Sequence, residues 1–259
     1  MSAVIAVLGL GEAGSLIARD LAAAGAAVRG YDPAVPAPPP ITDTGSEAEA
    51  ADGADLVLSV NSSKAAADAL RAGLPGMRPG AAWADLNTAS PGVKAGLAEI
   101  GRAHGVPVTD IAMMAPVPGN GIAVPMLASG EGAADVAGRL REFGADVEVL
   151  DGPAGLAATR KLLRSVFYKG MSTSIVEALE AARAAGYEDW LRDHIADELA
   201  RLDAAAVDRV VTGTRRHAVR RGTEMEAAAA MLTELGVAPL MADASRAVHE
   251  RLAAEPPSP

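Results

Sequence analysis

Short apolar runs alternate with segments of helical periodicity from residue 3 to residue 150. The run Ala3-Val-Ile-Ala-Val-Leu8 has no polar position, as expected of a parallel strand buried on both faces. Residues 15–24 place apolar side chains at helical spacing, and a second apolar run follows at 26–31. Further strands are predicted at 55–60, 81–85, 106–110, 124–129 and 147–150, and further helices at 46–52, 64–72, 92–104 and 133–143. This alternation predicts an α/β domain with a doubly wound parallel sheet.

Beyond residue 151 the pattern is helical almost to the end of the chain. Helices are predicted at about 156–185, 188–211, 214–235 and 239–254. Gly186, Gly213 and Gly236 are expected to separate them, because glycine interrupts helices. The chain should therefore divide into a sheet domain over residues 1–151 and an all-helical domain over residues 152–259.

Composition narrows the chemistry that the chain can perform. Half of its 259 residues are apolar but only 3% are aromatic, so aliphatic side chains must form most of the core. The absence of cysteine excludes disulfides, thiolate metal sites and a cysteine nucleophile. The four histidines show no metal-ligand spacing, so no metal site is expected.

The charge and the apolar runs also bear on partners. A net charge of −10 argues against binding to nucleic acids or to anionic membranes. No apolar run is long enough to span a bilayer, and the first residues lack the basic flank of a signal peptide. We therefore expect a cytoplasmic protein with no nucleic-acid or membrane partner.

A glycine-rich turn joins the first apolar run to the first helical segment. It reads Gly9-Leu-Gly11-Glu12-Ala13-Gly14, and Asp32 closes the second strand 18 residues after Gly14. Strand, G-x-G-x-x-G, helix, strand and acid, in this order, are the fingerprint of Rossmann-type dinucleotide-binding domains. The glycines allow a tight turn and a close backbone approach to the pyrophosphate, which then lies at the helix N-terminus.

The residues around this turn predict the cofactor. Asp32 favours NAD over NADP, because a carboxylate accepts hydrogen bonds from the adenosine ribose and repels a 2′-phosphate. Asn61 and Ser62 follow a later strand, at the sheet edge that binds ligands, although capping of the next helix explains them equally well. Residues 33–40 contain five prolines and are expected to form an exposed loop beside the adenine pocket. The predicted contacts are Gly9, Gly11, Glu12, Ala13, Gly14, Asp32, Asn61 and Ser62.

Lysine is rare in this chain and its positions are informative. Only four of the 23 basic residues are lysines, and two of them, Lys161 and Lys169, lie in the helix predicted over 156–185. Lys161, Ser165 and Tyr168 share one side of that helix, with Lys169 close by. An ammonium can release a proton that a guanidinium retains, so the stripe suits acid–base chemistry. An ordinary solvated lysine is the alternative.

Residues 215–221 form the one dense basic cluster of the chain. Arg216 and Arg220 are four positions apart, as are His217 and Arg221, so each pair is expected to share a helix face. The cluster either pairs with nearby acids such as Glu224 or clamps an anionic group of a substrate.

Several motifs, taken in order, resemble the β-hydroxyacid dehydrogenase/6-phosphogluconate dehydrogenase superfamily, which includes 3-hydroxyisobutyrate dehydrogenase and imine reductases. The glycine turn is similar to that superfamily's G-L-G-x-M-G fingerprint. Similar family motifs are matched by Asp85-Leu-Asn87-Thr88-Ala-Ser90-Pro91, by Ala115-Pro-Val-Pro-Gly119-Asn120-Gly121 and by Gly155 with Lys161. The resemblance covers about residues 1–185. It is greatest to a branch with a distinct helical C-terminal domain.

The resemblance implies roles for particular residues. Lys161 matches the family's catalytic lysine, and Thr88 matches a cofactor contact. The chain departs from the family pattern in three places. Ser165 replaces an asparagine, and Tyr168 stands where 6-phosphogluconate dehydrogenase has an acid. In the substrate loop, Pro118-Gly-Asn120 replaces Ser-Gly-Gly. The substrate is therefore not expected to be 6-phosphogluconate. Substrate contacts are expected from Pro118, Gly119, Asn120, Arg164, His217 and Arg220.

We therefore expect an NAD-dependent oxidoreductase acting on a small hydroxyacid-type substrate, which is anionic if the basic cluster clamps it. Lys161 would exchange a proton with the substrate hydroxyl, Ser165 would hydrogen-bond the same oxygen, and Tyr168 is a second proton donor. Imine reduction and a catalytically silent NAD-binding sensor are the alternatives. A homodimer is expected through the helical half, with the small-residue run at 227–232 as its seam.

Overall fold

A computed structural model describes residues 2–255 of the chain and divides it into two compact units. The first unit ends at Arg164 and the second begins at Ser165. The division falls inside a single helix, α6 (Leu156–Ala185), nine residues after its start. The sequence pattern had placed the domain boundary in the loop before this helix. Each unit is described by itself below.

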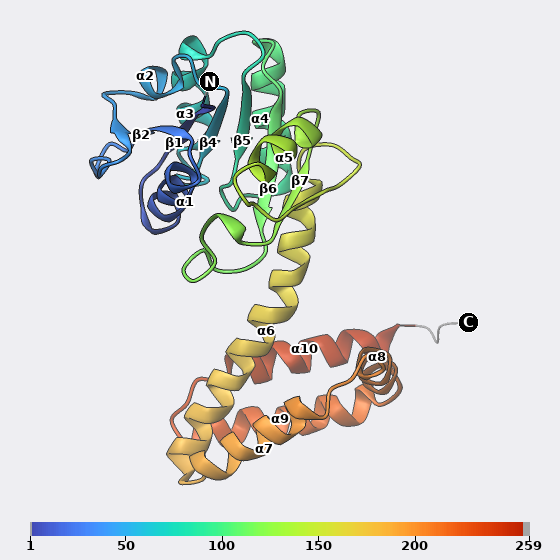
Figure 1. Cartoon of the computed structure of the whole chain (residues 1–259). Helices are drawn as coiled ribbons and strands as arrows, with labels where there is room; N and C mark the ends of the chain where they lie inside the picture. Colours follow the sequence, from blue (N-terminus) through green and yellow to red (C-terminus); the bar gives the residue numbers. More distant parts are fainter. Residues whose placement is uncertain (1, 256–259) are drawn as a thin grey trace. The chain divides into compact units, whose positions relative to one another are not determined.

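The first unit is built on one sheet of eight strands (Figure 1). The strands are β1 (Val4–Leu8), β2 (Ala27–Tyr31), β3 (Thr42–Asp43), β4 (Leu56–Ser59), β5 (Ala82–Asp85), β6 (Val108–Met113), β7 (Met126–Ser129) and β8 (Val147–Val149). They lie in the order β3-β2-β1-β4-β5-β6-β7-β8, which confirms the predicted α/β fold. Two features were not expected. One is the two-residue strand β3, and the other is that β7 and β8 run in the direction opposite to the other strands. β7 runs antiparallel to β6 because no α-helix crosses over between them, and β8 is parallel to β7.

Helices cover both faces of this sheet, as the alternation of side chains along its strands requires. Ile5 and Val7 pack with α1 (Glu12–Ala23) and α5 (Ala133–Arg141) on one face. Ala6 and Leu8, on the opposite face of the same strand, pack in the cluster that contains the other helices. These are α2 (Glu47–Ala51), α3 (Ala66–Gly73) and α4 (Pro91–Ala103). Serine side chains cap α2 and α4: Ser46 and Ser90 accept bonds from the N–H groups of Glu49 and Val93.

The strand order fixes where a ligand can enter. β2 lies on one side of β1 and β4 on the other, so the chain changes direction across the sheet at β1. The loops that follow β1 and β4 therefore lead to helices on opposite faces, α1 and α3. A crevice opens outside the carboxyl ends of strands at such a switch point.

The second unit is helical, and its helices differ in part from those predicted. Besides α6 it contains α7 (Glu188–Ala200), α8 (Ala206–Arg216), α9 (Ala218–Glu234) and α10 (Leu240–Ala254). The prediction of single helices at 188–211 and 214–235 was wrong: the chain breaks at 201–205, and Gly213 lies inside α8. Asp203 lies in this break, and its carboxylate pairs with Arg209 of α8 at 2.9 Å.

Glu177 joins two helices of this unit. Its carboxylate accepts hydrogen bonds from the N–H groups of Met241 (2.7 Å) and Ala242 (2.9 Å), at the start of α10. The α10 N-terminus has no cap of its own, so an acid on α6 satisfies two of its free donors. No helix within residues 2–255 combines the length and the apolarity that a membrane crossing requires.

Candidate functional site

The glycine turn after β1 has a geometry that only glycine satisfies at two of its positions. Gly9 has φ +96°, and a Cβ there would lie 2.7 Å from the backbone of Asn61. A Cβ at Gly14 would lie 1.9 Å from the carbonyl oxygen of Gly9. The turn is therefore packed against both the start of α1 and the loop after β4.

Gly11 is different, because a Cβ at this position would meet no heavy atom within 4 Å. It is the N-cap residue of α1, and no side chain caps that helix. The first N–H groups of a helix have no partner within it and carry its positive partial charge. Open space beside uncapped amides at Gly11, Glu12 and Ala13 is what a pyrophosphate group requires.

Asp32 lies at the end of β2 and holds the turn from the other side. One carboxylate oxygen accepts a bond from the N–H of Leu10 at 2.8 Å. The other accepts bonds from Ala34 (2.8 Å) and Val35 (3.1 Å), at the start of the proline-rich loop. Asp32 therefore fixes the glycine turn and the following loop, and its side chain remains only partly buried.

Asn61 and Ser62 are confirmed at the carboxyl end of β4, although part of their function there is structural. The hydroxyl of Ser62 accepts a bond from the N–H of Ala65 at 3.2 Å, just before α3. The side-chain oxygen of Asn61 accepts a bond from the amide of Asn87 at 2.9 Å. Asn87 follows β5, so this bond joins two neighbouring strand-end loops.

A row of buried polar side chains runs across four neighbouring strands and was not predicted. Ser59, Asp85, Asp110 and Ser129 are register partners from β4 to β7. Each is at most 1% exposed. Two carboxylates side by side in a dry sheet repel each other, so a cation is required.

Lys94, on α4, supplies that cation. Its ammonium lies 2.6 Å from Asp85 Oδ2 and 3.0 Å from Asp110 Oδ1, and it donates a bond of 2.8 Å to the carbonyl oxygen of Asp85. Its side chain is 1% exposed. The sequence carried a usable signal, because two predicted strands end in an acid and carboxyl ends of parallel strands meet at one edge.

Lys161 lies in the first unit, beside this network. It is partly buried and, with the residues that follow β5, lines a crevice that is too narrow in this structure to admit a water molecule. The other lining residues of interest are Asn87, Thr88, Lys94, Asp110 and Ala158. The structure thus brings Lys161 and Thr88 together, as expected if both belong to one site.

The segment Pro118-Gly119-Asn120 forms a tight turn between β6 and β7. The carbonyl of Val117 accepts bonds from the N–H groups of Asn120 (2.9 Å) and Gly121 (2.8 Å). Gly119 has φ +88°, which matches the third position of a type II turn with proline before it. The replacement of Ser-Gly-Gly by Pro-Gly-Asn therefore suits a rigid turn, and the Asn120 side chain bonds the carbonyl of Pro116 at 2.8 Å.

The remaining predicted residues lie elsewhere on the helices. Arg164 is exposed at the end of the first unit, while Ser165 is partly buried and Tyr168 is 53% exposed in the second.

His217 is exposed at the junction of α8 and α9. Arg220 pairs with Glu224, as the surface interpretation predicted. Arg216 and Arg220 do not share a helix, which corrects that expectation, because α8 ends at Arg216. Within residues 2–255 no cluster of three or more histidine or acidic side chains is arranged to bind a metal.

Two family comparisons agree with this division of the chain. Residues 4–124 match the family described as the NAD binding domain of 6-phosphogluconate dehydrogenase. Residues 182–252 match a family described as a domain of unknown function (DUF1932). A search of curated proteins gave no match.

Solved structures with the same fold cover almost the whole chain. A conserved hypothetical protein from Sinorhizobium meliloti 1021 shares 29% identity, with 100% of this chain and 92% of that one covered at a TM-score of 0.62. A conserved protein described as structurally similar to 3-hydroxyacid dehydrogenases shares 24% identity over 96% of both chains, with a TM-score of 0.61.

An imine reductase from Myxococcus stipitatus in complex with NADP+ shares 18% identity. The comparison covers 96% of this chain and 93% of that one, at a TM-score of 0.81. The resemblance inferred from the motifs is thereby confirmed. Residues 4–124 therefore match an NAD-binding domain of the 6-phosphogluconate dehydrogenase type and residues 182–252 a helical DUF1932 domain, in a fold shared with the solved imine reductase and with the protein described as similar to 3-hydroxyacid dehydrogenases.

Proposed function

We propose that the protein is an NAD(H)-dependent oxidoreductase that acts on a carbon bearing a hydroxyl group in a small hydroxyacid-type substrate. One observation carries the proposal. Lys161 shares a crevice with Asn87 and Thr88, in the same compact unit as the glycine turn. A proton-transfer group thus lies at the sheet edge where an α/β domain of this type binds its nicotinamide cofactor.

The chain's own residues supply the proton and the orientation. A bound nicotinamide supplies or accepts the hydride. The Lys161 amine takes the hydroxyl proton of the substrate during oxidation and returns it during reduction. Thr88 and the rigid turn at 118–120 are proposed to contact the cofactor and the substrate. Arg164, Ser165, Tyr168, His217 and Arg220 stay as proposed contacts to the substrate.

Asp32 supports NAD as the preferred cofactor. Its carboxylate is held just after β2 by three backbone N–H groups, beside the expected ribose position. A 2′-phosphate would be repelled there. No arginine follows Asp32 directly to neutralise such a group.

Imine reduction is the rival activity within this fold, and a silent NAD-binding sensor is the rival from another class. The fold alone does not separate them, since the imine reductase compared above is only 18% identical. Lys161 favours the hydroxyl substrate, because an amine can exchange a proton with a hydroxyl at neutral pH. The altered turn at Pro118 is the feature that favours a sensor.

A substrate panel tests the proposal. NADH and NAD+ are each incubated with the protein and with panels of small 2- and 3-hydroxyacids, their oxoacids, and cyclic imines, while absorbance at the nicotinamide band is followed. Turnover of a hydroxyacid or oxoacid that is lost in Lys161→Met supports the proposal. Turnover of imines alone contradicts it, and NADH binding without any turnover across the panel favours the sensor.

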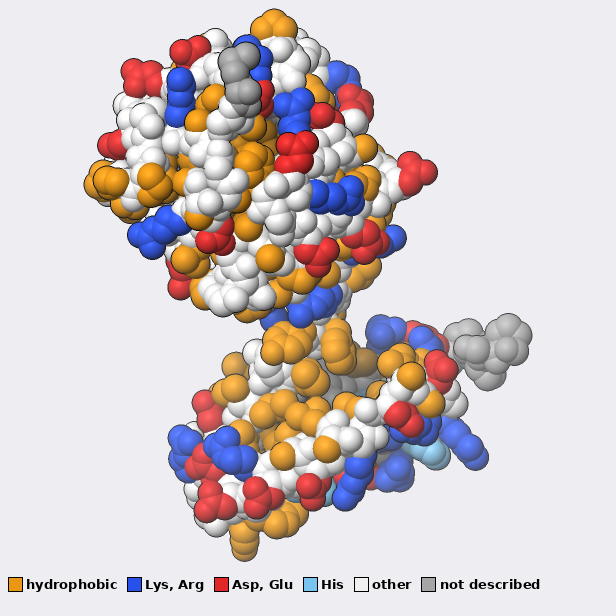
Figure 2. Space-filling model, in the orientation of Figure 1, with side chains coloured by type: hydrophobic (Ala, Val, Ile, Leu, Met, Phe, Trp, Pro, Cys, Tyr) orange, Lys and Arg blue, Asp and Glu red, His pale blue; other side chains and the backbone are white. Residues whose placement is uncertain are grey.

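We also propose that the protein is a homodimer, built through the helical unit. Figure 2 shows apolar side chains gathered on the visible face of this unit. No residue of α7 is buried, and Trp190 on that helix is 65% exposed. The other large apolar side chains that are at least 49% exposed in this unit are Val166, Phe167, Tyr168, Val176, Tyr187, Leu202, Val207, Val210, Val211, Val219, Met231 and Leu240. An apolar surface of this kind normally marks an interface.

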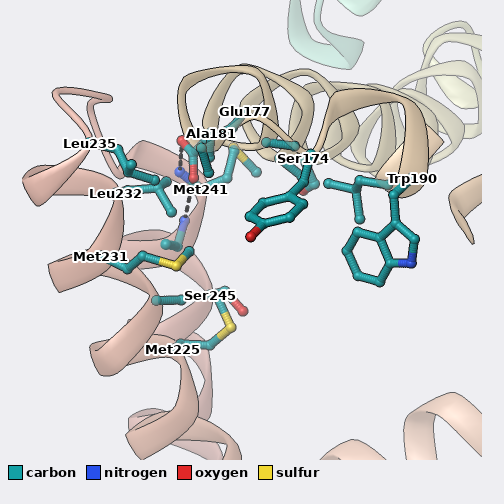
Figure 3. Close-up of a pocket in the computed structure, with 17 residues that line it drawn as sticks. Ser174, Glu177, Ala181, Trp190, Met225, Met231, Leu232, Leu235, Met241 and Ser245 are labelled. Carbon is teal, nitrogen blue, oxygen red and sulfur yellow. Dashed lines mark hydrogen bonds between the residues drawn. The ribbon is translucent and has the colours of Figure 1, made fainter.

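A groove in the same unit adds to this surface (Figure 3). It has a volume of about 520 Å³ and lies among α6, α7, α9 and α10. Met225, Met231 and Leu235 line one side, and Trp190 lines another. Flexible methionines and small alanines suit a helix from a second copy of the chain.

Light scattering tests the dimer. The wild-type protein should have twice the mass of one chain at micromolar concentration. Met231→Glu, in the groove, should shift the mass toward one chain. Val35→Asp is the matched control, because Val35 is comparably exposed at 43% but lies in the first unit. A monomeric wild type would contradict the proposal.

A further inference from the structure

The polar network around Lys94 extends beyond the sheet to the helix that carries Lys161. Asp110 Oδ1 faces Lys94 at 3.0 Å. Its other oxygen accepts bonds from the N–H groups of Gly155 (3.0 Å) and Ala158 (2.9 Å). The hydroxyl of Ser129 accepts a bond from the N–H of Ala157 at 3.0 Å. The polar row of the sheet therefore caps the first turn of α6.

The charges of this network balance only with α6 in place. One ammonium faces two carboxylates, which leaves one negative charge in a site that excludes water. The positive end of the α6 dipole and its two N–H donors offset the charge on Asp110. The same bonds close this helix N-terminus to any anionic ligand, whereas the α1 N-terminus stays open.

We propose that Lys94 is a positioning residue for Lys161. Ala158 precedes Lys161 by three residues, so both lie on the same side of α6. Asp110 fixes the turn that bears Ala158, and Lys94 fixes Asp110. On its other side, Lys94 holds Asp85, which accepts a bond of 2.6 Å from the Asn87 amide. One buried ammonium thus sets the spacing between Lys161 and the loop of Asn87 and Thr88.

This role of Lys94 in catalysis rests on the proposed role of Lys161. The positioning of Lys161 by Lys94 can nevertheless be tested without a substrate. The chain has only four lysines, so trace labelling with acetic anhydride can be read residue by residue by mass spectrometry. Lys64 and Lys169 are exposed and lie outside the network, so they serve as internal references. The quantity measured is the labelling rate of Lys161 relative to these two lysines.

Lys94→Met alone leaves two buried carboxylates without a cation, so its thermal midpoint should fall by roughly 10 °C or more. The informative variant is Lys94→Met combined with Asp85→Asn, which removes one charge of each sign and should recover most of that loss. In this double variant the relative labelling rate of Lys161 should still rise several-fold, because Lys94 no longer fixes Asp110, the residue that holds the turn before Lys161.

Thr109→Val is the matched control, since Thr109 is buried beside Asp110 and its hydroxyl has no hydrogen-bond partner within the described residues. It should leave the labelling of Lys161 unchanged. A folded double variant with wild-type labelling of Lys161 would overturn the inference and leave Lys94 as a structural ion pair. If the double variant does not fold, Asp110→Asn decides by the same readout, because it breaks the Lys94–Asp110 ion pair and leaves Lys94 paired with Asp85. Wild-type labelling of Lys161 in a folded Asp110→Asn protein would overturn the inference. A failed substrate panel would not affect this result.

Discussion

The carboxylate of Asp20, on α1, accepts a hydrogen bond of 2.8 Å from the backbone N–H of Ile122, 102 positions later in the chain. The helix that starts at the glycine turn is thereby tied to the loop that contains Pro118, Gly119 and Asn120. Gly121 makes this contact possible: its φ is +54°, and a Cβ there would lie 1.8 Å from Asp20 Oδ2. This bond joins the proposed cofactor helix to the proposed substrate loop, and Ile122 packs in the same core cluster as Ile17 and Leu21 of α1.

Loss of the Asp20 carboxylate should loosen that loop. We expect Asp20→Ala to lower the free energy of unfolding by about 1.5–3 kcal/mol, the range for a hydrogen bond to a charged group. Asp20→Asn should cost less, because its amide oxygen can still accept the bond. Chemical denaturation of both variants measures the effect. Equal losses in the two variants would show that charge, and not the bond to Ile122, is what matters.

Two glycines of the turn should respond differently to the same substitution. Gly14→Ala would bring a Cβ within 1.9 Å of the Gly9 carbonyl, so the fold itself should be destabilised. Gly11→Ala meets no neighbour, so its thermal midpoint should stay near that of the wild type. NADH affinity should nevertheless fall by about tenfold or more in Gly11→Ala, because the methyl group occupies the approach of the pyrophosphate. Fluorescence titration measures the NADH affinity and thermal melting measures the stability. Unchanged NADH affinity in Gly11→Ala would show that the pyrophosphate does not bind at this turn.

Local patterns were sufficient to predict seven of the eight strands and the glycine turn. The strand β1 and the turn after it are specified within about a dozen consecutive residues, so periodicity and spacing reveal them. The direction of β7 depends instead on the connection before it, which contains no crossover α-helix. A short apolar run predicts a strand but does not predict the direction of that strand.

The contacts of Lys94 depend on the strand register. Asp85 and Asp110 become neighbours only when β5 pairs with β6. The break between α7 and α8 was missed because Gly213, which was expected to separate two helices, lies inside α8.

Asp32 should determine the choice between the two nicotinamide cofactors. NADH should bind more tightly than NADPH to the wild type, and Asp32→Asn should narrow the difference by about tenfold, equivalent to about 1.4 kcal/mol. Asparagine is preferable to alanine here, because its oxygen can still accept the bond from Leu10 and keep the turn in place. Fluorescence titration with both cofactors measures the ratio. Tighter binding of NADPH to the wild-type protein would contradict the assignment of NAD.

Glu188 should make the stability of the helical unit sensitive to acid. Hydrogen bonds from Arg183 (2.6 and 2.8 Å) and Arg192 (2.9 Å) hold the pKa of the Glu188 carboxyl at about 2, below its usual 4.5. Because the folded pKa is depressed, the stabilisation is complete above the unfolded pKa and is lost as the pH falls from 4.5 toward 2. The difference in thermal midpoint between wild type and Glu188→Gln should be constant at neutral pH and shrink below pH 4.5. Asp189→Asn controls for the loss of a charge in the same helical turn, and a difference that persists into acid would refute the linkage.

Lys161 and Lys169 lie eight residues apart on α6, and only Lys161 should transfer the proton. Lys161 lines the crevice with Asn87 and Thr88, whereas Lys169 is exposed in the second unit. Lys161→Met should lower turnover by roughly 10²–10⁴-fold with little change in cofactor affinity, as expected for loss of a general acid–base group.

Lys161→Arg should be almost as damaging, because a guanidinium keeps the positive charge but does not release a proton at neutral pH. Lys169→Met, the matched control, should retain turnover. The measurement is turnover against pH for the three variants, with the substrate that the panel identifies. If Lys161→Arg retained near-normal turnover, the lysine would act only as a positive charge that orients the substrate. The proton would then have to pass through Tyr168 or water, and the proposed mechanism would have to be revised.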